Sequence, residues 1–253
     1  MDSVVRRPGL ISEAGSRSFY EQFLESEDYR ASRYEKAVLV AEILADELRT
    51  RKRIVDLGSG SGLVKRHLEK KYQKPVLGIE IDRQVIQDPE FTLVGDVCVL
   101  PLKSKSIDLA ICNHLYEHIQ GRNRFAGELR RVLSPGGIAY LTVGNKFQFR
   151  EPHYRLPLLS WFSGPVANSY LRITGRGKDY SDINFPTFRR LRRESEQGGL
   201  KVRDITFEVL SGHPERMSRG QRIAFKLLKA LSVKMRALFI QCLSPQWFVI
   251  LSE

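Results

Sequence analysis

The chain has 253 residues, and its 42% hydrophobic content can fill the core of one α/β domain, so disorder is not indicated. Its formal net charge of +12 is uneven, because residues 145–253 hold 19 Lys and Arg against 9 Asp and Glu. Such a basic part is typical of binding to nucleic acid, to an anionic membrane surface or to an acidic substrate. A solvated basic face without a binding partner is the alternative.

Cysteine usage and hydropathy bear on the setting of the protein. The three cysteines, Cys98, Cys112 and Cys242, are scattered and odd in number, which suits a reducing cytoplasm. No uninterrupted apolar run reaches the roughly 18 residues that span a bilayer, and the first residues lack the pattern of a secretion signal. We therefore expect a cytoplasmic protein without a spanning helix.

Two helices are predicted ahead of the first strand. Residues 1–15 show little periodicity and are expected to be a loose arm. Residues 16–30 form a polar stretch with interspersed aromatic side chains, and residues 37–48 place apolar side chains at helical spacing.

A buried strand, a glycine turn and the start of a helix are predicted in residues 53–63, RIVDLGSGSGL. Glycines in such a turn permit a positive φ, a close ligand approach and close packing of helix on strand. The carboxylate of Asp56 at the strand end would repel a pyrophosphate but attract a cation. A nucleotide-like ligand with a cationic end is therefore favoured.

Four further strands follow, and the first two of them end in acidic residues. They are predicted at residues 75–82, 91–97, 107–113 and 133–143. Glu80 lies 18 residues after Gly62, close to the roughly 20-residue spacing at which an acidic side chain meets a ribose diol.

Five motifs stand in order within about residues 50–145: VDLGSGSG, GIEID, GDVCVLPLKSKSIDLAI, HLYEHI and ELRRVLSPGG. In these motifs the chain resembles the class I S-adenosylmethionine-dependent methyltransferases, and within them the small-molecule branch typified by the ubiquinone and menaquinone C-methyltransferases. The resemblance implies a single α/β domain with a Rossmann-like seven-stranded sheet in the order 3-2-1-4-5-7-6. It also implies S-adenosyl-L-methionine as the cofactor.

The motifs and the resemblance together give an expected cofactor site. The glycine turn admits the amino-acid end, Glu80 accepts from both ribose hydroxyls, and Asp96 with Val97 frames the adenine. The N-terminal helical part, residues 1–50, is expected to cap the core of residues 51–145. The expected cofactor-binding residues are Asp56, Gly58, Ser59, Gly60, Gly62, Glu80, Ile81, Asp96, Val97 and Asn113, with Tyr20, Tyr29 and Tyr34 as candidate cleft-wall residues.

Two histidines are candidates for a general base, which is needed when the acceptor is a hydroxyl or an acidic carbon. His118 follows the fourth strand, where open α/β sheets bind ligands, and His153 follows the fifth. His114 and His118 are also spaced as a metal pair on a helix would be, but no third ligand is evident, so we expect no metal.

The chain after the fifth strand leaves the common pattern. Residues 146–180 are too apolar and proline-broken for a simple solvated loop, which predicts a lid or acceptor region with Glu151, His153, Tyr154 and Trp161 as contacts. A local cover of the sheet is the alternative. A basic helix is predicted at residues 181–197, with Pro186 in its first turn. Two more strands, at residues 200–209 and 247–251, complete the predicted sheet.

An insertion at residues 211–244 is predicted to hold one amphipathic helix, residues 219–243. Its basic and apolar sides are typical of a helix at a membrane surface, and a helix packed on the domain is equally compatible. In the first case, a peripheral membrane enzyme could take a lipid-linked acceptor past an apolar entrance. The apolar side comprises Ala224, Leu228, Leu231, Met235 and Leu238, and the entrance Leu158, Trp161 and Phe162.

The sequence thus predicts a methyltransferase acting on a small or lipid-linked molecule in a cytoplasmic biosynthetic pathway. An RNA methyltransferase is the alternative that the charge favours, although no N/D-P-P-Y motif, no paired catalytic cysteines and no separate RNA-binding module are visible. A non-catalytic cofactor-binding relative is the other alternative. The sequence gives no indication of the acceptor, the methylated atom or the oligomeric state.

Overall fold

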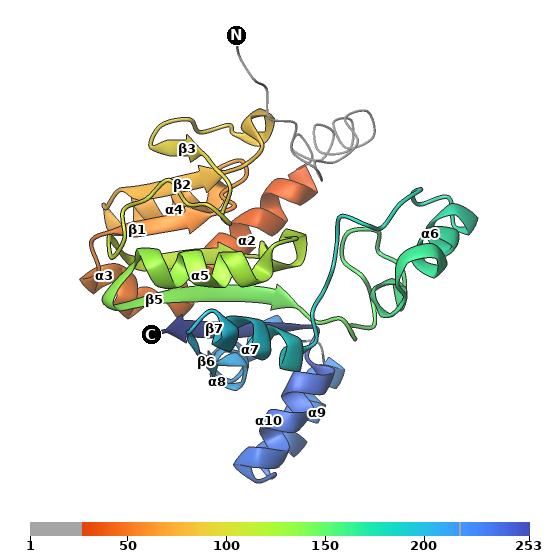
Figure 1. Cartoon of the computed structure of the whole chain (residues 1–253). Coiled ribbons are helices and arrows are strands. Elements are labelled where there is room, and N and C mark those ends of the chain that lie inside the picture. Colours follow the sequence, from red (N-terminus) through yellow and green to blue (C-terminus); the bar gives the residue numbers. More distant parts are fainter. Residues whose placement is uncertain (1–26, 218) are drawn as a thin grey trace.

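The computed structural model describes residues 27–217 and 219–253. It contains a seven-stranded sheet in the order β3-β2-β1-β4-β5-β7-β6 (Figure 1), which confirms the predicted order. The strands are β1 (Ile54–Leu57), β2 (Val76–Glu80), β3 (Thr92–Val94), β4 (Ile107–Asn113), β5 (Leu133–Gly144), β6 (Lys201–Asp204) and β7 (Gln246–Ser252).

The strand directions place the ends that matter for ligand binding at one edge. Strands β1 to β5 pair in parallel, whereas β7 runs antiparallel to both of its neighbours, β5 and β6. In the centre, Val55 lies opposite Leu77 on one side and Ala110 on the other. Parallel strands end at the same edge, so the carboxyl ends of β1, β2 and β4 lie together there.

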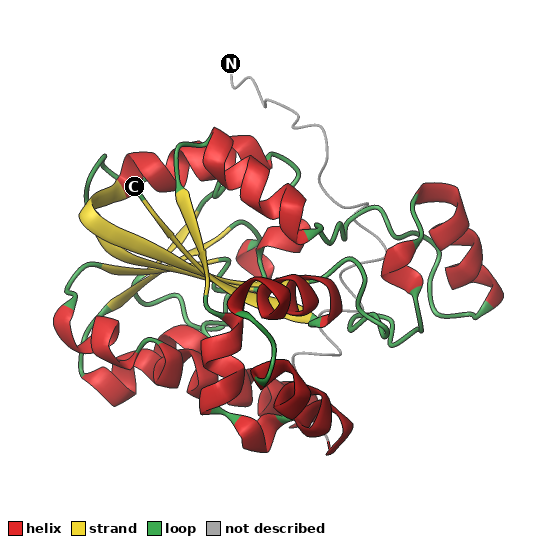
Figure 2. Cartoon of the chain, turned by 90° about the horizontal axis from the view of Figure 1, so that it is seen from below, coloured by secondary structure: helices red, strands yellow, loops and turns green. Residues whose placement is uncertain are grey.

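Helices cover both faces of the sheet (Figure 2). On one face lie α2 (Glu27–Ile43), α3 (Ala45–Thr50), α4 (Leu63–Tyr72) and α8 (Thr206–Gly212), and on the other α5 (Arg122–Val132) and α7 (Phe188–Gln197). Alternate residues of β1 serve the two layers: Ile54 packs with the first set of helices, and Val55 and Leu57 with the second. Burial on both faces explains why β1 reads as a continuous apolar run, interrupted only by Asp56.

Residues 146–180, the lid, form a packed lobe that projects from the end of β5 (Figure 1). The lobe contains the 3-10 turn η3 (Leu159–Trp161), the helix α6 (Gly164–Ile173) and an isolated bridge between Arg150 and Pro157. The further 3-10 turns of the chain are η1 (Arg83–Val85), η2 (Tyr116–His118) and η4 (Pro214–Arg216). The lobe has a hydrophobic cluster of its own, formed by Leu156, Leu159, Ala167, Leu171 and Tyr180.

The insertion before β7 corrects a prediction. Instead of one helix over residues 219–243, the chain forms α9 (Arg219–Lys229) and α10 (Val233–Leu243). Ser232 separates them because its hydroxyl accepts a hydrogen bond from the Met235 N–H and thereby caps α10. Within the described residues, no helix combines the length and apolarity needed to cross a membrane.

The strand predicted at residues 200–209 stops at Asp204. The carboxylate of Asp204 accepts a hydrogen bond from the Thr206 N–H, and α8 begins there. The Thr206 hydroxyl in turn accepts from the Phe248 N–H at 3.0 Å, which ties the start of α8 to β7.

Three other predicted boundaries differ. The helix predicted at 181–197 begins only at Phe188, because Thr187 caps it and Pro186 precedes the cap. The strand predicted at 91–97 is limited to β3, because the Asp96 carboxylate turns back to accept from the Cys98 N–H. Helix α2 starts at Glu27, ahead of the predicted residue 37, and most of the helix predicted at 16–30 lies outside the described residues.

The two tryptophans of the chain offer a matched test of the core. Trp247 is fully buried and packs edge-on against Phe188 at 5.3 Å between ring centroids, whereas Trp161 in the lid is 47% exposed. We expect Trp247→Ala to lower the free energy of unfolding by about 3–5 kcal/mol because it leaves a large cavity. The matched Trp161→Ala should cost about 1 kcal/mol or less. Urea unfolding followed by circular dichroism gives both values, and equal losses would contradict this assignment.

Candidate functional site

The turn between β1 and α4 depends on its three glycines. Gly58, Gly60 and Gly62 have φ values of +68°, +54° and +77°. A Cβ on Gly58 would lie 2.7 Å from Leu115 Cδ1, and one on Gly62 would lie 2.9 Å from the Cβ of Asp88. A Cβ on Gly60 would meet no atom within 4 Å. Gly58 and Gly62 therefore allow close packing, and Gly60 is where a ligand can approach the backbone.

The Glu80 carboxylate at the end of β2 holds this turn. Its Oε2 accepts a hydrogen bond from the Gly60 N–H at 2.8 Å, and its Oε1 accepts from the N–H groups of Ile81 at 2.8 Å and Asp82 at 3.1 Å. A carboxylate has about four acceptor positions, so about one remains, on Oε2, for a ribose hydroxyl. The sequence predicted that Glu80 contacts both ribose hydroxyls. The free acceptor position on Oε2 has room for a hydrogen bond from one of them.

Three buried polar atoms at this edge have no hydrogen-bond partner among the described residues. They are Asp56 Oδ2, Ser59 Oγ and Asn113 Nδ2, and their side chains belong to residues that are 1%, 8% and 9% exposed. A buried polar group without a partner is costly, so such atoms are found where a ligand completes the hydrogen bonding. All three were predicted as cofactor-binding, and their chemistry fits a ligand with both donors and acceptors.

The electrostatics of the edge centre on Asp56. Burial, and then the negative charge of Glu80, raises the pKa of Asp56 to about 7, against the opposing charges of Arg33 and Lys65. Lys65 is itself buried and bridges to Asp88 at 3.0 Å and to Glu69 at 3.4 Å. A ligand cation beside Asp56 would therefore favour the ionised carboxylate.

The remaining predicted cofactor residues follow β2 and β3. Ile81 is 46% exposed, Asp96 is partly buried and accepts from Cys98 N–H at 2.8 Å, and Val97 packs against the core. They lie after strands whose carboxyl ends form the same edge as Glu80. A planar base could thus be framed between them, as the resemblance implies.

Helix α2 brings a cation to the site that sequence reasoning missed. Burial, and then the charge of Arg33, lowers the pKa of Lys36 to about 8, while the charge of Glu117 acts in the opposite direction. Tyr34, a candidate for the cleft wall, is 58% exposed and packs edge-on against His67 of α4. Tyr20 and the side chain of Tyr29 lie outside the described residues.

His114 and Glu117 form a buried pair after β4. His114 Nδ1 lies 3.2 Å from Glu117 Oε1. Burial, and then the charge of Lys36, lowers the pKa of His114 to about 4. Burial would raise the pKa of Glu117, but its hydrogen bond with His114 and the charges of His114 and His118 together outweigh that effect, and the pKa falls to about 2. At neutral pH the pair is thus a neutral imidazole and a carboxylate, and the part of the chain that the structure describes has no group of three potential ligands for a metal.

The two histidines predicted as bases meet, although 35 positions separate them. The rings of His118 and His153 lie edge to face at 5.3 Å between centroids. Burial lowers the pKa of His118, which favours its neutral form. His153 Nδ1 lies 2.7 Å from Oε1 of Glu151, whose other oxygen accepts from the Tyr154 N–H at 2.6 Å. Glu151 is fully buried, and its role as the partner of His153 was missed, although the E-x-H spacing is a local signal for it.

The wall behind His153 is formed where the lid returns to the sheet. His153 packs against Phe185 at 5.8 Å, and the Phe185 ring lies so close to Gly144, at the end of β5, that a Cβ there would meet it at 2.4 Å. Burial, and then the negative charge of Glu151, raises the pKa of Tyr180, so its hydroxyl stays protonated. The histidine pair thus lies between the carboxyl ends of β4 and β5 and the lid.

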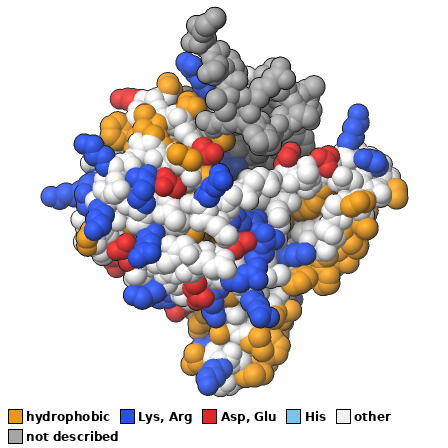
Figure 3. Space-filling view, in the orientation of Figure 1, with side chains coloured by type: hydrophobic (Ala, Val, Ile, Leu, Met, Phe, Trp, Pro, Cys, Tyr) orange, Lys and Arg blue, Asp and Glu red, His pale blue; other side chains and the backbone are white. Residues whose placement is uncertain are grey.

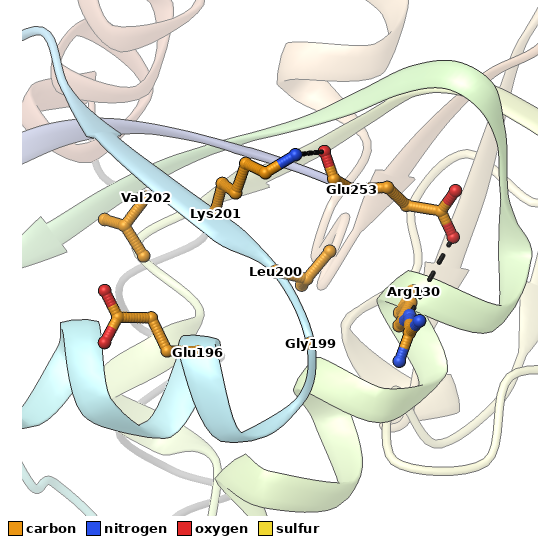
Figure 4. Close-up of a pocket in the computed structure, with 7 residues that line it drawn as sticks. All are labelled: Arg130, Glu196, Gly199, Leu200, Lys201, Val202 and Glu253. Atoms are coloured by element: carbon orange, nitrogen blue, oxygen red, sulfur yellow. Dashed lines mark hydrogen bonds and ion pairs between the residues drawn. The ribbon is translucent and has the colours of Figure 1, made fainter.

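A shallow hollow of about 650 Å³ lies elsewhere and is no candidate (Figure 4). It forms where β6 begins and β7 ends, at the opposite edge of the sheet from Glu80. Charged side chains tie it together: Lys201 Nζ donates to the Glu253 backbone oxygen at 2.9 Å, and Arg130 Nε lies 3.9 Å from the Glu253 carboxylate. We find no unpartnered buried polar atom among its lining residues.

Comparison with known proteins agrees with this geometry. The family described as "Methyltransferase domain" matches residues 55–141. The chain is 27% identical over 133 residues to malonyl-[acyl-carrier protein] O-methyltransferase 1 of Coxiella burnetii, covering 49% of this chain and 47% of that protein. It is 28% identical over 114 residues to norajmaline N-methyltransferase of Rauvolfia serpentina, covering 40% and 39%. The chain thus spans less than half the length of these curated relatives.

The fold comparison covers nearly the whole chain. A crystal structure of a SAM-dependent methyltransferase from Archaeoglobus fulgidus superposes with a TM-score of 0.57 at 14% identity, covering 94% of this chain and 98% of that one. Residues 55–141 therefore match a methyltransferase domain, and the chain has the fold of the class I S-adenosylmethionine-dependent methyltransferases, as the resemblance predicted. The cofactor of this class is S-adenosyl-L-methionine, and the polar atoms around Gly60 fit it.

The raised pKa of Asp56 predicts that cofactor binding depends on pH. Below pH 7 the free carboxyl is mostly neutral, and above it mostly ionised, so a ligand ammonium group should bind more tightly as the pH rises. We expect the affinity for S-adenosylhomocysteine to rise up to about tenfold between about pH 5.5 and 7.5. Calorimetric titration measures it, and Asp56→Asn should flatten the profile. A flat wild-type profile, or an equal slope in the variant, would contradict the role of Asp56.

Proposed function

We propose that the protein transfers a methyl group from S-adenosyl-L-methionine to a small or lipid-linked acceptor in a biosynthetic pathway. The observation that carries the proposal is the carboxyl edge of β1, β2 and β4, where Gly60 is open to a ligand and Glu80 fixes the turn. The relatives named above act, by their names, on malonyl-[acyl-carrier protein] and on norajmaline, which supports a small or carrier-linked acceptor.

The cofactor supplies an electrophilic methyl group on a sulfonium, so the residues of this chain have to bind, orient and shield. Glu80 takes a ribose hydroxyl through the free position of Oε2. Asp56 takes the ammonium group, and Asn113 Nδ2 and Ser59 Oγ complete hydrogen bonds at the same edge. Orientation of this kind accounts for much of the rate of a methyl transfer, because it replaces a bimolecular encounter by a fixed geometry.

Acid–base work falls to His153. Glu151 accepts the Nδ1–H of His153, which fixes the tautomer with Nε2 as the free acceptor. Nε2 can then take the proton of an acceptor hydroxyl or acidic carbon as the methyl group moves. His118 supports the ring of His153 from the side, and Glu151 is the positioning residue.

The lid supplies the shielding. Its cluster around Leu159 and Leu171 holds the lid together, and the segment that follows the lid is fixed where the Asn184 N–H donates to the Glu117 carbonyl at 2.8 Å. A buried Arg122 also donates from its guanidinium to the Asn184 carbonyl. The lid thus bounds the acceptor side with apolar and aromatic groups, which excludes water from the transfer.

Labelled methyl transfer tests the proposed function. The purified protein is incubated with cell extract and cofactor carrying an isotopically labelled methyl group, and the products are separated by liquid chromatography and mass spectrometry. We expect a labelled small or lipid-linked product with the wild type. Gly60→Arg, which fills the open face of the turn, should give none, because the cofactor cannot approach the backbone. Equal labelling in both samples would contradict the proposal.

The role of His153 predicts a kinetic difference between two neighbouring histidines. His153→Gln should bind cofactor normally but lose about 10²- to 10⁴-fold in turnover. His118→Gln is the matched control, because the His118 ring packs against that of His153. We expect this variant to lose less than about tenfold in turnover. Full activity of His153→Gln would show that positioning suffices, as for a nucleophilic carbon or an acceptor that is already ionised.

The contribution of Glu151 is separable from that of His153. Glu151→Gln keeps an oxygen acceptor for Nδ1–H but removes the charge, so kcat should fall while the affinity for the cofactor stays within about twofold of the wild type. A purely structural role for Glu151 would lower stability and cofactor affinity together, without a selective fall in kcat.

A further inference from the structure

The α9–α10 pair presents apolar side chains to solvent. Met235, Leu238, Phe239 and Leu243 of α10 are spaced at i, i+3, i+4 and i+8, and they are 45%, 56%, 38% and 71% exposed. On α9, Ile223 and Leu227 are 58% and 69% exposed. The inner side is anchored instead by Phe225, whose ring stacks on Phe207 of α8 at 5.0 Å. The outward stripe is therefore left without a covering element among the described residues.

The lid presents a second set of exposed apolar side chains. Phe149 is 72% exposed, Ile173 84% and Val166 57%. Phe147 and Trp161 stack edge-on at 5.4 Å between ring centroids, and each is 47% exposed. The packed cluster inside the lid thus does not use these side chains.

One residue joins the bases of the two segments. Asn145, 1% exposed, donates from its side-chain amide to the carbonyls of Cys242 at 3.1 Å and Ser244 at 2.8 Å, at the end of α10. Its backbone N–H donates to the Pro245 carbonyl, and the lid begins at the next residue. Figure 3 shows that hydrophobic side chains gather on both segments along the same side of the molecule.

The charge of both segments is mainly positive. Residues 216–252 contain seven Lys and Arg and no Asp or Glu. Residues 146–180 contain six Lys and Arg and two acids: Glu151 is fully buried, and the exposed Asp179 accepts hydrogen bonds from Asn168 and Ser181. Exposed cations thus flank exposed apolar side chains on both segments and outnumber the one exposed carboxylate.

We propose that the lid and the α9–α10 pair form one docking surface for an anionic lipid bilayer. Aliphatic side chains such as Ile173, Leu227 and Leu243 can enter the acyl boundary but cannot stack on bases, which disfavours RNA as the occupant. Lys and Arg at the rim match anionic headgroups. The binding does not depend on methyl transfer, so it holds or fails separately from the proposed function.

Arg236 is not a clean probe of contacts with lipid headgroups, because it also has a contact within the protein. Its guanidinium lies 4.3 Å from the centroid of the Phe207 ring, so it also holds α10 against α8. Lys229 likewise lies over Phe225. Arg222, Lys226 and Lys234 are exposed and have no such contact in the described residues, which makes them the cations to change.

Co-sedimentation with vesicles of phosphatidylcholine containing either no or about 30% phosphatidylserine tests the surface on the full chain. We expect binding to the anionic vesicles alone, weakened by salt. Each cation near an anionic surface strengthens binding roughly fivefold, so Arg222→Glu/Lys226→Glu/Lys234→Glu should lower the partition coefficient by about 100-fold or more. The matched control Arg66→Glu/Lys70→Glu/Lys71→Glu, on α4, makes the same charge change away from the surface and should stay within about threefold of the wild type.

Two variants with apolar side chains replaced test whether the lid and the α9–α10 pair bind the bilayer as one surface. Phe149→Ser/Ile173→Ser in the lid and Leu238→Ser/Leu243→Ser on α10 should each lower the partition coefficient at least about tenfold. The proposal is overturned if the wild type stays in the supernatant at low salt, if the α4 control loses as much as the α9–α10 variant, or if only one apolar pair matters. A lipid-free dimer that Leu238→Ser/Leu243→Ser dissociates would identify a second copy as the occupant instead.

Discussion

The hydrogen bond from the Gly60 N–H to the Glu80 carboxylate is the contact on which the rest of the site depends. It ties the glycine turn after β1 to the end of β2, so the turn cannot move independently of the sheet. With the turn fixed, Gly62 caps α4 in a left-handed conformation, and Lys65 reaches the carboxylate of Asp88 from the first turn of that helix. A buried cation without those partners would cost several kcal/mol, so these contacts stabilise one another.

The same carboxylate sets the charge of the cleft. Glu80 lies near Asp56, and two buried acids cannot both ionise without a counter-charge. Lys65 and Arg33 supply part of it, and a ligand ammonium group would supply the rest. An arrangement that lacks one positive charge selects a cationic ligand over an anionic one, which is the opposite of a pyrophosphate site built on a similar turn.

Local spacing was sufficient to predict the glycine turn and the strands around it, because these signals lie within a few residues of one another, whereas the sheet order came from the resemblance that the motif series carries. Contacts between residues far apart in the chain could not be predicted from the sequence. The apolar spacing of residues 219–243 continues across the break at Ser232, so it could not show that two helices form. Alternation over residues 200–209 is equally compatible with a strand, and what ends β6 at Asp204 is the contact of Thr206 with Phe248, 42 positions away. The meeting of His118 and His153 is of the same kind.

Asn145 connects the sheet, the end of α10 and the start of the lid. It follows the last residue of β5, so its backbone position is set by the sheet, while its side chain holds the end of α10 and its neighbours begin the lid. His153, eight residues further on, is positioned by Glu151 within that lid and by His118 from the β4 side. In the proposed docking, a force that seats the lid and α10 on a bilayer would act through Asn145 on the wall of the proposed acceptor site. The linkage we propose between docking and acceptor access rests on this one buried amide, because it anchors the bases of both segments.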